Sequence, residues 1–515
     1  MGKIAGIDLG TTFSALAVLN ELGKPETVPN ADGERITPST VFFAEDGVIL
    51  VGEEAVNACA SEPKNGARWV KRFMGQDYFP YDVNNKKWTP AELSSFILRK
   101  LKEDCGAQVG EIHDAVITVP AYFDESRRKA TMDAGKLAGL NVVGIVNEPT
   151  AAALYYATQY SVGGRIMVFD LGGGTFDVTL MDVNGQQVDI LCSRGDHQLG
   201  GVDFDKSLLT IMEKKYKEET SGTLITDDES KARLMLEAET LKKTLSKRKT
   251  ATATLYGDSG QYKFKISQED FEESISPLMA RISMLVEDVL DEAETEPEDV
   301  SSVLLVGGST RLPAVQNRLQ KLFNFPPTCA VNVDECVALG AAIHAGLRLM
   351  KDNPSKVTKG IASGLDKIGL QEVCSHCYGT LAMTHDEATD RDVLANDVLI
   401  KKNTPIPCTI SKTYYTAAAG QISVDAKVTQ HSTATTDADI ANVVASGSLQ
   451  LPQGRPAGQP VIITYSYDEN QRMRCEFKDE KSGKTLILDI DTQAGSMSRT
   501  DVQNKAKELE AYTID

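Results

Sequence analysis

Apolar and polar residues alternate with two different periods along the first two thirds of the chain. Residues 114–123, DAVITVPAYF, form a mostly apolar run that predicts a buried strand. Residues 126–139, SRRKATMDAGKLAG, instead have the pattern of a helix. Strand-like and helix-like segments follow one another in this way to about residue 350. This alternation is typical of an α/β fold, so we expect residues 1–351 to form such a domain.

Two charged stretches within this domain are predicted to be helical. The first covers residues 226–249, and the second covers residues 267–293. Ser267 opens the second stretch, and Asp270 follows three positions later. That spacing is typical of a capping box, in which the two side chains satisfy free N–H groups at a helix start.

The pattern changes after residue 351. Residues 352–372 are mixed and contain glycine, and we interpret them as an interdomain linker. Residues 373–495 are rich in Thr, Val, Ile and Tyr, in short alternating runs such as QISVDAKVTQ and PVIITYSYD. Short strands separated by turns indicate an all-β sandwich.

The last twenty residues are predicted to end the chain in one short amphipathic helix. Within residues 496–515, Val502, Ala506 and Leu509 recur at helical spacing. Ser498 precedes them, with Asp501 three positions later, which predicts the helix start.

Composition limits the classes of function. A chain of 515 residues is too long for one hydrophobic core, so we expect several folding units. Its net charge of −19 argues against general binding to nucleic acid, whose phosphates would repel it. We find no apolar run of eighteen residues and no signal-peptide pattern, and the nine cysteines are mostly scattered. We therefore expect a cytoplasmic protein that binds neither membrane nor nucleic acid.

One phrase occurs twice in the chain. AGIDLGTTFSALAVL begins at residue 5, and IMVFDLGGGTFDVTLMDV begins at residue 166. Each copy has an apolar run, an Asp, a glycine turn and a Thr, and then residues that alternate with period two. A period of two after the turn predicts a β-hairpin, whereas dinucleotide and P-loop motifs lead from the turn into a helix.

Two such hairpins facing each other are suited to hold a phosphate chain. A glycine turn lets backbone N–H groups approach an anion, and Thr adds a hydroxyl donor. Asp cannot hold phosphate itself but can hold Mg²⁺, directly or through water. A third glycine loop, in VSSVLLVGGSTRLPAVQNRL, leads from a strand into a helix and is suited to the approach of a flat nucleoside. An ordinary hairpin, or an ordinary strand–helix turn, is the alternative for each loop taken alone.

With these loops in place, the chain closely resembles the DnaK-type heat-shock chaperones, the seventy-kilodalton heat-shock protein family. The resemblance rests on GIDLGTTFS, ITVPAYF, NEPTAAAL, FDLGGGTFD, LGGVDFD, LKKTLS, LVGGSTRLP and DECVALGAA, in family order over residues 1–345. It implies a two-lobed ATPase domain of the actin and sugar-kinase fold, which hydrolyses ATP to ADP with Mg²⁺, and it implies K⁺ as a second cation. Residues 373–492 match the family's peptide-binding β domain more weakly.

The resemblance also implies roles for individual residues. Asp8 and Asp170 would lie at the magnesium, and Lys71, Glu148, Asp170 and Thr175 would be catalytic. The implied nucleotide-binding residues are Gly10, Thr11, Thr12, Phe13, Gly173, Gly174, Thr175, Gly200, Gly201, Glu239, Lys242, Lys243, Ser246, Gly308, Ser309, Arg311 and Asp334. Without the resemblance, Lys71 would be interpreted as a solvated surface lysine and KKTLSKRK as a basic patch.

The family resemblance implies partners and leaves two other functions open. The implied partners are unfolded or extended polypeptides, a J-domain co-chaperone and a nucleotide-exchange factor, and Met383, Ala417 and Val424 align with residues of the peptide groove. One alternative is a chaperone relative that holds clients or regulates another chaperone with weak domain coupling. The other is a small-molecule kinase of the same fold.

Two departures from the family pattern bear on these alternatives. The linker lacks the family's leucine-rich run, which suggests weaker or differently arranged coupling between the domains. The family continues into a long helical lid, of which residues 496–515 would be only the start. Separately, Cys374 and Cys377 form a CxxC pair. Two ordinary reduced cysteines are a simpler interpretation than a metal or redox site, because a structural zinc site needs four ligands.

Overall fold

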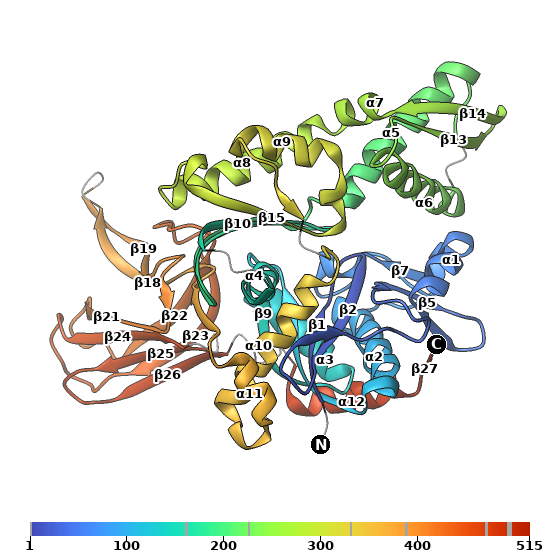
Figure 1. The fold of residues 1–515 in the computed structure, drawn as a ribbon. Helices are drawn as coiled ribbons and strands as arrows, with labels where there is room; N and C mark the ends of the chain where they lie inside the picture. The colour runs from blue at the N-terminus through green and yellow to red at the C-terminus, as the bar shows by residue number, and fades with distance from the viewer. Residues whose placement is uncertain are drawn as a thin grey trace.

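The structure is a computed structural model that describes residues 3–159, 163–224, 227–329, 332–386, 390–468, 472–491 and 497–515. Its first two thirds contain two sheets with helices around them, and its last third is mainly strands (Figure 1). None of the helices within the described residues is long and apolar enough to span a membrane.

The first sheet carries the first copy of the repeated phrase. Its spatial order is β3 (Pro25–Thr27), β2 (Phe13–Leu19), β1 (Lys3–Asp8), β8 (Ile112–Val119) and β9 (Asn141–Asn147), and β4 (Thr37–Pro38) also pairs with β2. Strands β1 and β2 are antiparallel, whereas β8 and β9 run parallel to β1. The first copy therefore forms a hairpin, as predicted.

The second sheet repeats this arrangement with the second copy. Its spatial order is β12 (Gln187–Asp196), β11 (Phe176–Asn184), β10 (Gly164–Leu171), β15 (Val300–Val306) and β16 (Thr328–Cys329). Here too the first three strands along the chain are antiparallel neighbours, and the next two are parallel to the first. The two copies of the phrase thus open two halves with the same topology, and each copy is a hairpin.

Helices and small sheets surround these two sheets. The helices of this region are α1 (Glu53–Ser61), α2 (Pro90–Val109), α3 (Glu125–Leu137), α4 (Glu148–Gln159), α5 (Gly201–Thr220), α6 (Asp228–Leu245), α7 (Gln268–Ser274), α8 (Ser276–Glu292), α9 (Pro313–Phe323) and α10 (Cys336–Asp352). The small strands are β5 (Thr40–Phe43), β6 (Val48–Val51), β7 (Gly66–Arg68), β13 (Thr250–Gly257) and β14 (Gly260–Ser267). The predicted helix over 226–249 is α6, and the predicted capping box of Ser267 and Asp270 opens α7.

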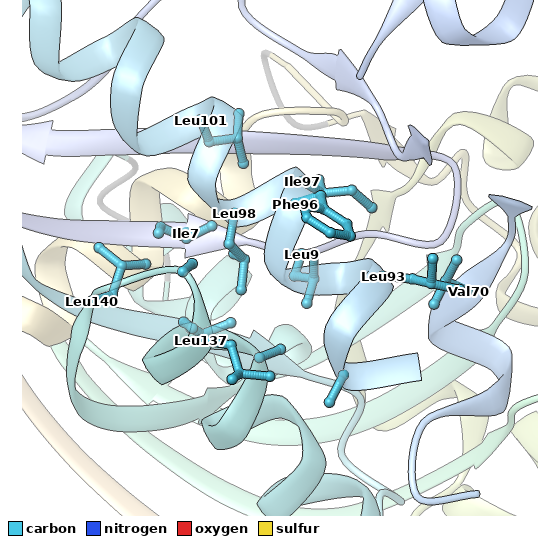
Figure 2. Packing of buried hydrophobic residues seen from close by; sticks show 14 of the residues in the cluster. Ile7, Leu9, Val70, Leu93, Phe96, Ile97, Leu98, Leu101, Leu137 and Leu140 are labelled. Carbon is cyan, nitrogen blue, oxygen red and sulfur yellow. The ribbon is translucent and has the colours of Figure 1, made fainter. Parts of the chain in front are cut away.

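The hydrophobic core of the first half fixes the first loop. Leu93, Phe96 and Leu98 of α2 are buried beside Ile7 and Leu9 (Figure 2). Because Ile7 and Leu9 flank Asp8, their burial leaves that carboxylate little freedom to move.

The last third of the chain forms a sandwich of two four-stranded sheets. One sheet has the order β19 (Arg391–Ile400), β18 (Cys377–Asp386), β22 (Ser423–His431) and β23 (Asn442–Gln450). The other has the order β21 (Cys408–Tyr415), β24 (Pro460–Tyr467), β25 (Arg472–Asp479) and β26 (Thr485–Asp491). Residues of both sheets, such as Val428, Tyr465 and Phe477, share one core. We call this sandwich the β domain.

Residues 352–372 contain more regular structure than a linker was expected to have. They include the end of α10, α11 (Lys359–Leu365) and most of β17 (Gly369–Val373). Strand β17 lies parallel to β12 and antiparallel to β20 (Pro405–Ile406), so it joins the second sheet to the β domain. Although the leucine-rich run is missing, the segment is therefore docked as a strand.

The C-terminal segment packs against the first half of the chain and not over the β domain, where a lid would lie. Helix α12 (Arg499–Glu510), capped by Ser498 as predicted, packs beside α3 of the first half (Figure 1). Val502 and Leu509 are buried in the same core as Ile7. Strand β27 (Thr513–Ile514) then pairs with β6, and the Val51 amide donates to the carbonyl oxygen of Asp515 over 2.9 Å. Within the described residues, α12 is thus a part of the first half.

Candidate nucleotide-binding site

The two glycine loops touch each other. A Cβ atom on Gly173 would lie 1.7 Å from the hydroxyl oxygen of Thr12, and one on Gly174 would lie 2.3 Å from the methyl carbon of Thr11. Such distances leave no room for any side chain at Gly173 or Gly174. The glycines of the second loop therefore let the first loop approach, and the two loops enclose one small space.

Three aspartates stand at the ends of the strands that lead to these loops. Asp8 ends β1 and accepts a hydrogen bond from the Thr118 hydroxyl over 3.1 Å. Asp170 lies opposite Asp177 in the hairpin of β10 and β11, and Asp177 accepts from the Ala121 amide over 3.1 Å. Asp170 is 8% exposed and Asp177 is 1% exposed. Asp8 is partly buried at the end of β1, whose immediately preceding residues are buried. The hairpin geometry thus gathers carboxylates beside the glycine turns.

A buried lysine and glutamate complete this group. Lys71 and Glu148 are each 5% exposed and form an ion pair through the lysine Nζ and glutamate Oε1. Lys71 lies in a 3-10 helix, Val70–Phe73, and Glu148 begins α4. Burial by itself would lower the pKa of Lys71, but the charges of Glu148 and Asp8 raise it by more. The net pKa is therefore raised, and the ammonium is retained. The interpretation of Lys71 as a surface lysine is therefore wrong.

Negative charge exceeds positive charge in this group. Burial, followed by the charge of Glu148, raises the pKa of Asp8 to about 7. The same two causes, in the same order, raise the pKa of Asp170 and of Asp177 well above the usual range. Carboxylates in such a place would be stabilised as anions by a bound cation.

The chemistry of the small space fits a metal-bound phosphate chain. The hydroxyl oxygens of Thr11 and Thr12 are buried and have no hydrogen-bond partner among the described residues, so donors are available to an anion. These residues line a cavity of about 80 Å³ with Asp8, Lys71 and Asp170. The described residues contain no cluster of three His, Cys, Asp or Glu arranged to hold a metal. Mg²⁺ does not need one, because it commonly takes one or two carboxylates plus water and phosphate.

A larger cavity of about 480 Å³ adjoins the small one and shares Thr12, Phe13 and Gly173 with it. Helix α6 forms one wall, where Lys242 donates to Asp205 over 2.9 Å and Lys243 pairs with Glu239 at 2.9 Å. Two lysines of KKTLSKRK are therefore ion-paired beside this cavity, which argues against a free basic patch.

The third glycine loop forms the opposite wall. Gly307 has a φ of 80°, and a Cβ there would lie 2.5 Å from the carbonyl oxygen of Leu171, so the position favours glycine. The Ser309 hydroxyl donates to the Gly172 carbonyl over 2.9 Å, which joins the third loop to the second. Arg311 donates to both oxygens of Asp334, over 3.0 and 2.7 Å. The loop predicted to face a nucleoside thus borders the larger cavity.

Most of the predicted nucleotide-site residues line one of the two cavities. The predicted residues that line them are Asp8, Gly10, Thr11, Thr12, Phe13, Lys71, Glu148, Asp170, Gly173, Thr175, Glu239, Lys242, Lys243, Ser246, Gly308, Ser309, Arg311 and Asp334. Gly174, Gly200 and Gly201 do not line them but pack behind the loops. A Cβ on Gly200 would lie 2.6 Å from the Gly174 amide, and one on Gly201 would lie 2.7 Å from the Ser309 hydroxyl.

Three neighbours of the cavities were missed by the sequence analysis. Trp69 lines the larger cavity with a φ of 58°, and the guanidinium of Arg68 lies 4.8 Å from the centre of its ring. Arg72 donates to the Gly174 carbonyl over 2.9 Å and pairs with Asp203. Their position beside Lys71 is the one hint that the sequence offers for Trp69 and Arg72.

The residues aligned with a peptide groove do not all meet. Met383 is 56% exposed and, with Leu394, Tyr414 and Tyr415, lines a cavity of about 820 Å³ in the β domain. Ala417 is exposed in the loop after β21, where its amide donates to Gln421. Val424 packs against the core of the sandwich. Of the three, Met383 alone lines this cavity.

Sequence comparisons identify relatives of this chain. The family model described as "Hsp70 protein" matches residues 4–515. Over 543 aligned residues the chain is 36% identical to the chaperone protein dnaK of Cyanidium caldarium. That alignment covers 99% of this chain and 83% of the relative.

Proposed function

Because the chain belongs to the Hsp70 family of ATP-dependent chaperones, we propose that its own two glycine loops bind Mg-ATP and that it hydrolyses ATP to ADP and phosphate. The observation that carries this proposal is the contact between the loops of Thr12 and Gly173 around the buried group of Lys71, Glu148 and Asp170. Neither the holding or regulatory alternative nor the small-molecule kinase is favoured by the family.

We assign the domains as follows. Residues 1–351 would form a two-lobed ATPase domain of the actin type, which the repeated sheet topology supports. Residues 352–372 would act as the linker and residues 373–495 as the peptide-binding domain, with residues 496–515 beyond it. The docking of α12 supports counting the last segment with the ATPase domain in space.

Phosphoryl transfer to water depends mainly on positioning and on neutralising charge. A magnesium bound at Asp8 and Asp170, through water, would neutralise charge on the phosphates. The Lys71 ammonium would lie at the terminal phosphate, with Glu148 positioning the ammonium and the attacking water. The backbone of Gly10, Thr11 and Gly173 and the hydroxyls of Thr12 and Thr175 would hold the phosphate oxygens.

The larger cavity would take the nucleoside. Glu239, Lys242, Lys243 and Ser246 of α6 would face it on one side, and Gly308, Ser309 and Arg311 on the other. Asp334 would fix the guanidinium of Arg311. A bound K⁺ ion and the identity of J-domain or exchange-factor partners remain family expectations.

The β domain would bind extended apolar segments of unfolded polypeptides. Its cavity of about 820 Å³ presents Met383, Leu394 and Tyr415, which are 56%, 51% and 67% exposed. Exposed apolar side chains gathered around a hollow mark a binding surface.

The test is single-turnover ATP hydrolysis by the purified chain, with and without an unfolded apolar peptide. We expect Lys71→Ala to slow hydrolysis at least 100-fold while nucleotide still binds, because charge at the terminal phosphate is lost. Lys24→Ala, an exposed lysine of the same half, should leave the rate unchanged. Hydrolysis by Lys71→Ala at the wild-type rate would refute the role of the buried pair.

A further inference from the structure

Three cysteines meet where β17 enters the β domain. Cys374 follows the last residue of β17, Cys377 begins β18, and Cys408 begins β21. Sequence alone indicated the CxxC pair, whereas Cys408 lies more than thirty residues further along the chain. Pairing of β17 with β20, in which Glu372 lies opposite Ile406, brings Cys408 to the same place.

Within this group, Cys374 interacts more strongly with Cys408 than with Cys377, its neighbour in the CxxC pair. Cys408 packs against the hydrophobic core that contains Cys374, and a hydrogen bond between the two thiols raises the pKa of Cys374 and lowers that of Cys408. The sulfur of Cys377 instead accepts the Lys402 amide over 3.2 Å. Cys374 is fixed by its backbone, since its amide donates to the Thr404 carbonyl over 2.9 Å and its carbonyl accepts the Asn403 amide over 2.8 Å.

The two hydrogen-bonded thiols differ in exposure and in acidity. Cys374 is fully buried in the core of the β domain, and burial raises its pKa far above the usual range. Cys408 is partly exposed, and its hydrogen bond with Cys374 lowers its pKa to about 7. Oxidant-sensitive cysteines are commonly accessible, acidic and placed beside a second thiol. Cys408 has these three properties, and Cys374 is the second thiol.

We propose that Cys408 and Cys374 form a disulfide when the protein meets hydrogen peroxide. The Cys408 thiolate attacks one peroxide oxygen, which forms an S–O bond, breaks the O–O bond and releases hydroxide. The Cys374 sulfur then attacks the sulfenic acid, which forms the S–S bond and releases the oxygen as water with the Cys374 proton. In total, two thiols are oxidised to one disulfide, and one peroxide is reduced to two waters.

The disulfide would close the loop that contacts the ATPase domain. Residues 401–407 connect β19 to β21. In this loop, Lys402 Nζ donates to the Ser193 carbonyl over 2.6 Å. The side-chain Nδ2 of Asn403 donates to the Glu292 carboxylate over 2.6 Å. A bond from Cys374 to Cys408 would join the end of this loop at β21 to the end of β17, beside the hydrogen bonds that hold Asn403 and Thr404 to Cys374. Oxidation should therefore stiffen the joint through which peptide binding would influence the ATPase domain.

The first experiment treats the full-length chain with hydrogen peroxide, blocks remaining thiols and maps the peptides by mass spectrometry. We expect the free-thiol count to fall by two from the nine in the sequence, with Cys374 and Cys408 found in one linked peptide. Cys374→Ser and Cys408→Ser should each abolish that peptide. Cys475→Ala, at a buried thiol of the same core, should keep it. A Cys374–Cys377 bond, or no linked peptide, would overturn the pairing.

The second experiment measures the effect on coupling and rests on the proposed ATPase function. We expect oxidation to lower the stimulation of ATP hydrolysis by an apolar peptide at least twofold and dithiothreitol to restore it. Cys408→Ser should keep its stimulation after peroxide. Unchanged stimulation in a protein that carries the linked peptide would overturn the regulatory role. Because the linked peptide is detected without any ATPase assay, failure of the proposed function and failure of the pairing are distinguishable.

Discussion

At the scale of single residues, the site depends on how closely two loops approach. Strand-to-turn patterns predicted Asp8, Thr11 and Gly173 as neighbours of a phosphate, because the same Asp, glycine turn and Thr occur in both copies of the phrase. Apart from its position beside Lys71, nothing in the sequence predicted Trp69, because its place in the cavity depends on a left-handed backbone conformation that a tryptophan seldom adopts. Cys408 was missed for a related reason, since a contact between distant strands leaves no local pattern.

Gly173→Ala should weaken ATP binding at least tenfold. Its Cβ would lie 1.7 Å from the Thr12 hydroxyl, so the loops must separate and the buried donors around the phosphates would be misplaced. Titration calorimetry with ATP and Mg²⁺ measures the effect. Gly172→Ala is the matched control, because a Cβ there lies 3.7 Å from its nearest neighbour, the Thr175 carbonyl. Equal affinities for the two variants would contradict this account of the loop contact.

At the scale of elements, helix and strand types were more predictable than their partners. The stripe of Val502, Ala506 and Leu509 predicted that one face of α12 is buried, and it is. A stripe does not say what covers it, so the sequence suggested the start of a lid where the structure has a helix against α3. The linker is a similar case, because the short run of β17 has too few residues to show a period.

Leu509→Ala should destabilise the first half by about 2–5 kcal/mol, because a fully buried leucine leaves a cavity. Urea unfolding followed by tryptophan fluorescence measures this, since both tryptophans, Trp69 and Trp88, lie in that half. Trp88 is also 6.0 Å from the ring of Tyr512, centre to centre, so it reports on the C-terminal segment directly. Glu510→Ala, at an exposed neighbour, should change the free energy of unfolding little. A similar loss in both variants would mean that α12 is not packed as described.

Leu370→Asp should remove peptide stimulation of the ATPase and leave the unstimulated rate within about twofold. Leu370 lies opposite Val188 in the pairing of β17 with β12 and packs against the core between the two sheets. A carboxylate there would be partly buried against apolar side chains, so the strand should leave the sheet. Peptide-stimulated hydrolysis measures the change, and Lys367→Asp, at an exposed position, is the control. Retained stimulation in Leu370→Asp would show that coupling does not pass through β17.

At the scale of the whole molecule, the β domain contacts the proposed ATPase domain through specific side chains. The Glu125 amide donates to Gln430 over 3.3 Å, and Lys402 reaches Ser193. Between the two lies His376, which is 7% exposed and lines a cavity of about 110 Å³ with Tyr122 and Arg194. The family resemblance predicted two domains, but this arrangement of them could not be obtained from any local pattern.

Contact between the domains should weaken as pH falls below about 6.5. Burial, followed by the charges of Arg128 and Lys402, lowers the pKa of His376 to about 3 while the domains are in contact. If separation exposes this imidazole, its pKa returns to about 6.5, so the separated form takes up a proton that the docked form cannot. The docking equilibrium should then fall up to tenfold per pH unit between pH 6.5 and about 3.

Small-angle scattering between pH 7.5 and 5.5 measures this change as a rise in the radius of gyration. His376→Asn should show a smaller rise, because the titrating group is gone. His113→Asn, at an exposed histidine of the first half, should behave as the wild type does. A rise of the same size in His376→Asn would assign the pH dependence to other groups.

The β domain is attached to the proposed ATPase domain on both sides of it along the chain. The chain leaves by β17, which is paired with β12, and it is fixed again at Met497, whose amide donates to Asp133 over 3.1 Å. A body attached at one point can turn about any axis, whereas a body attached at two separate points swings about the line between them. While both attachments persist, the β domain should therefore move by rotation about this single axis.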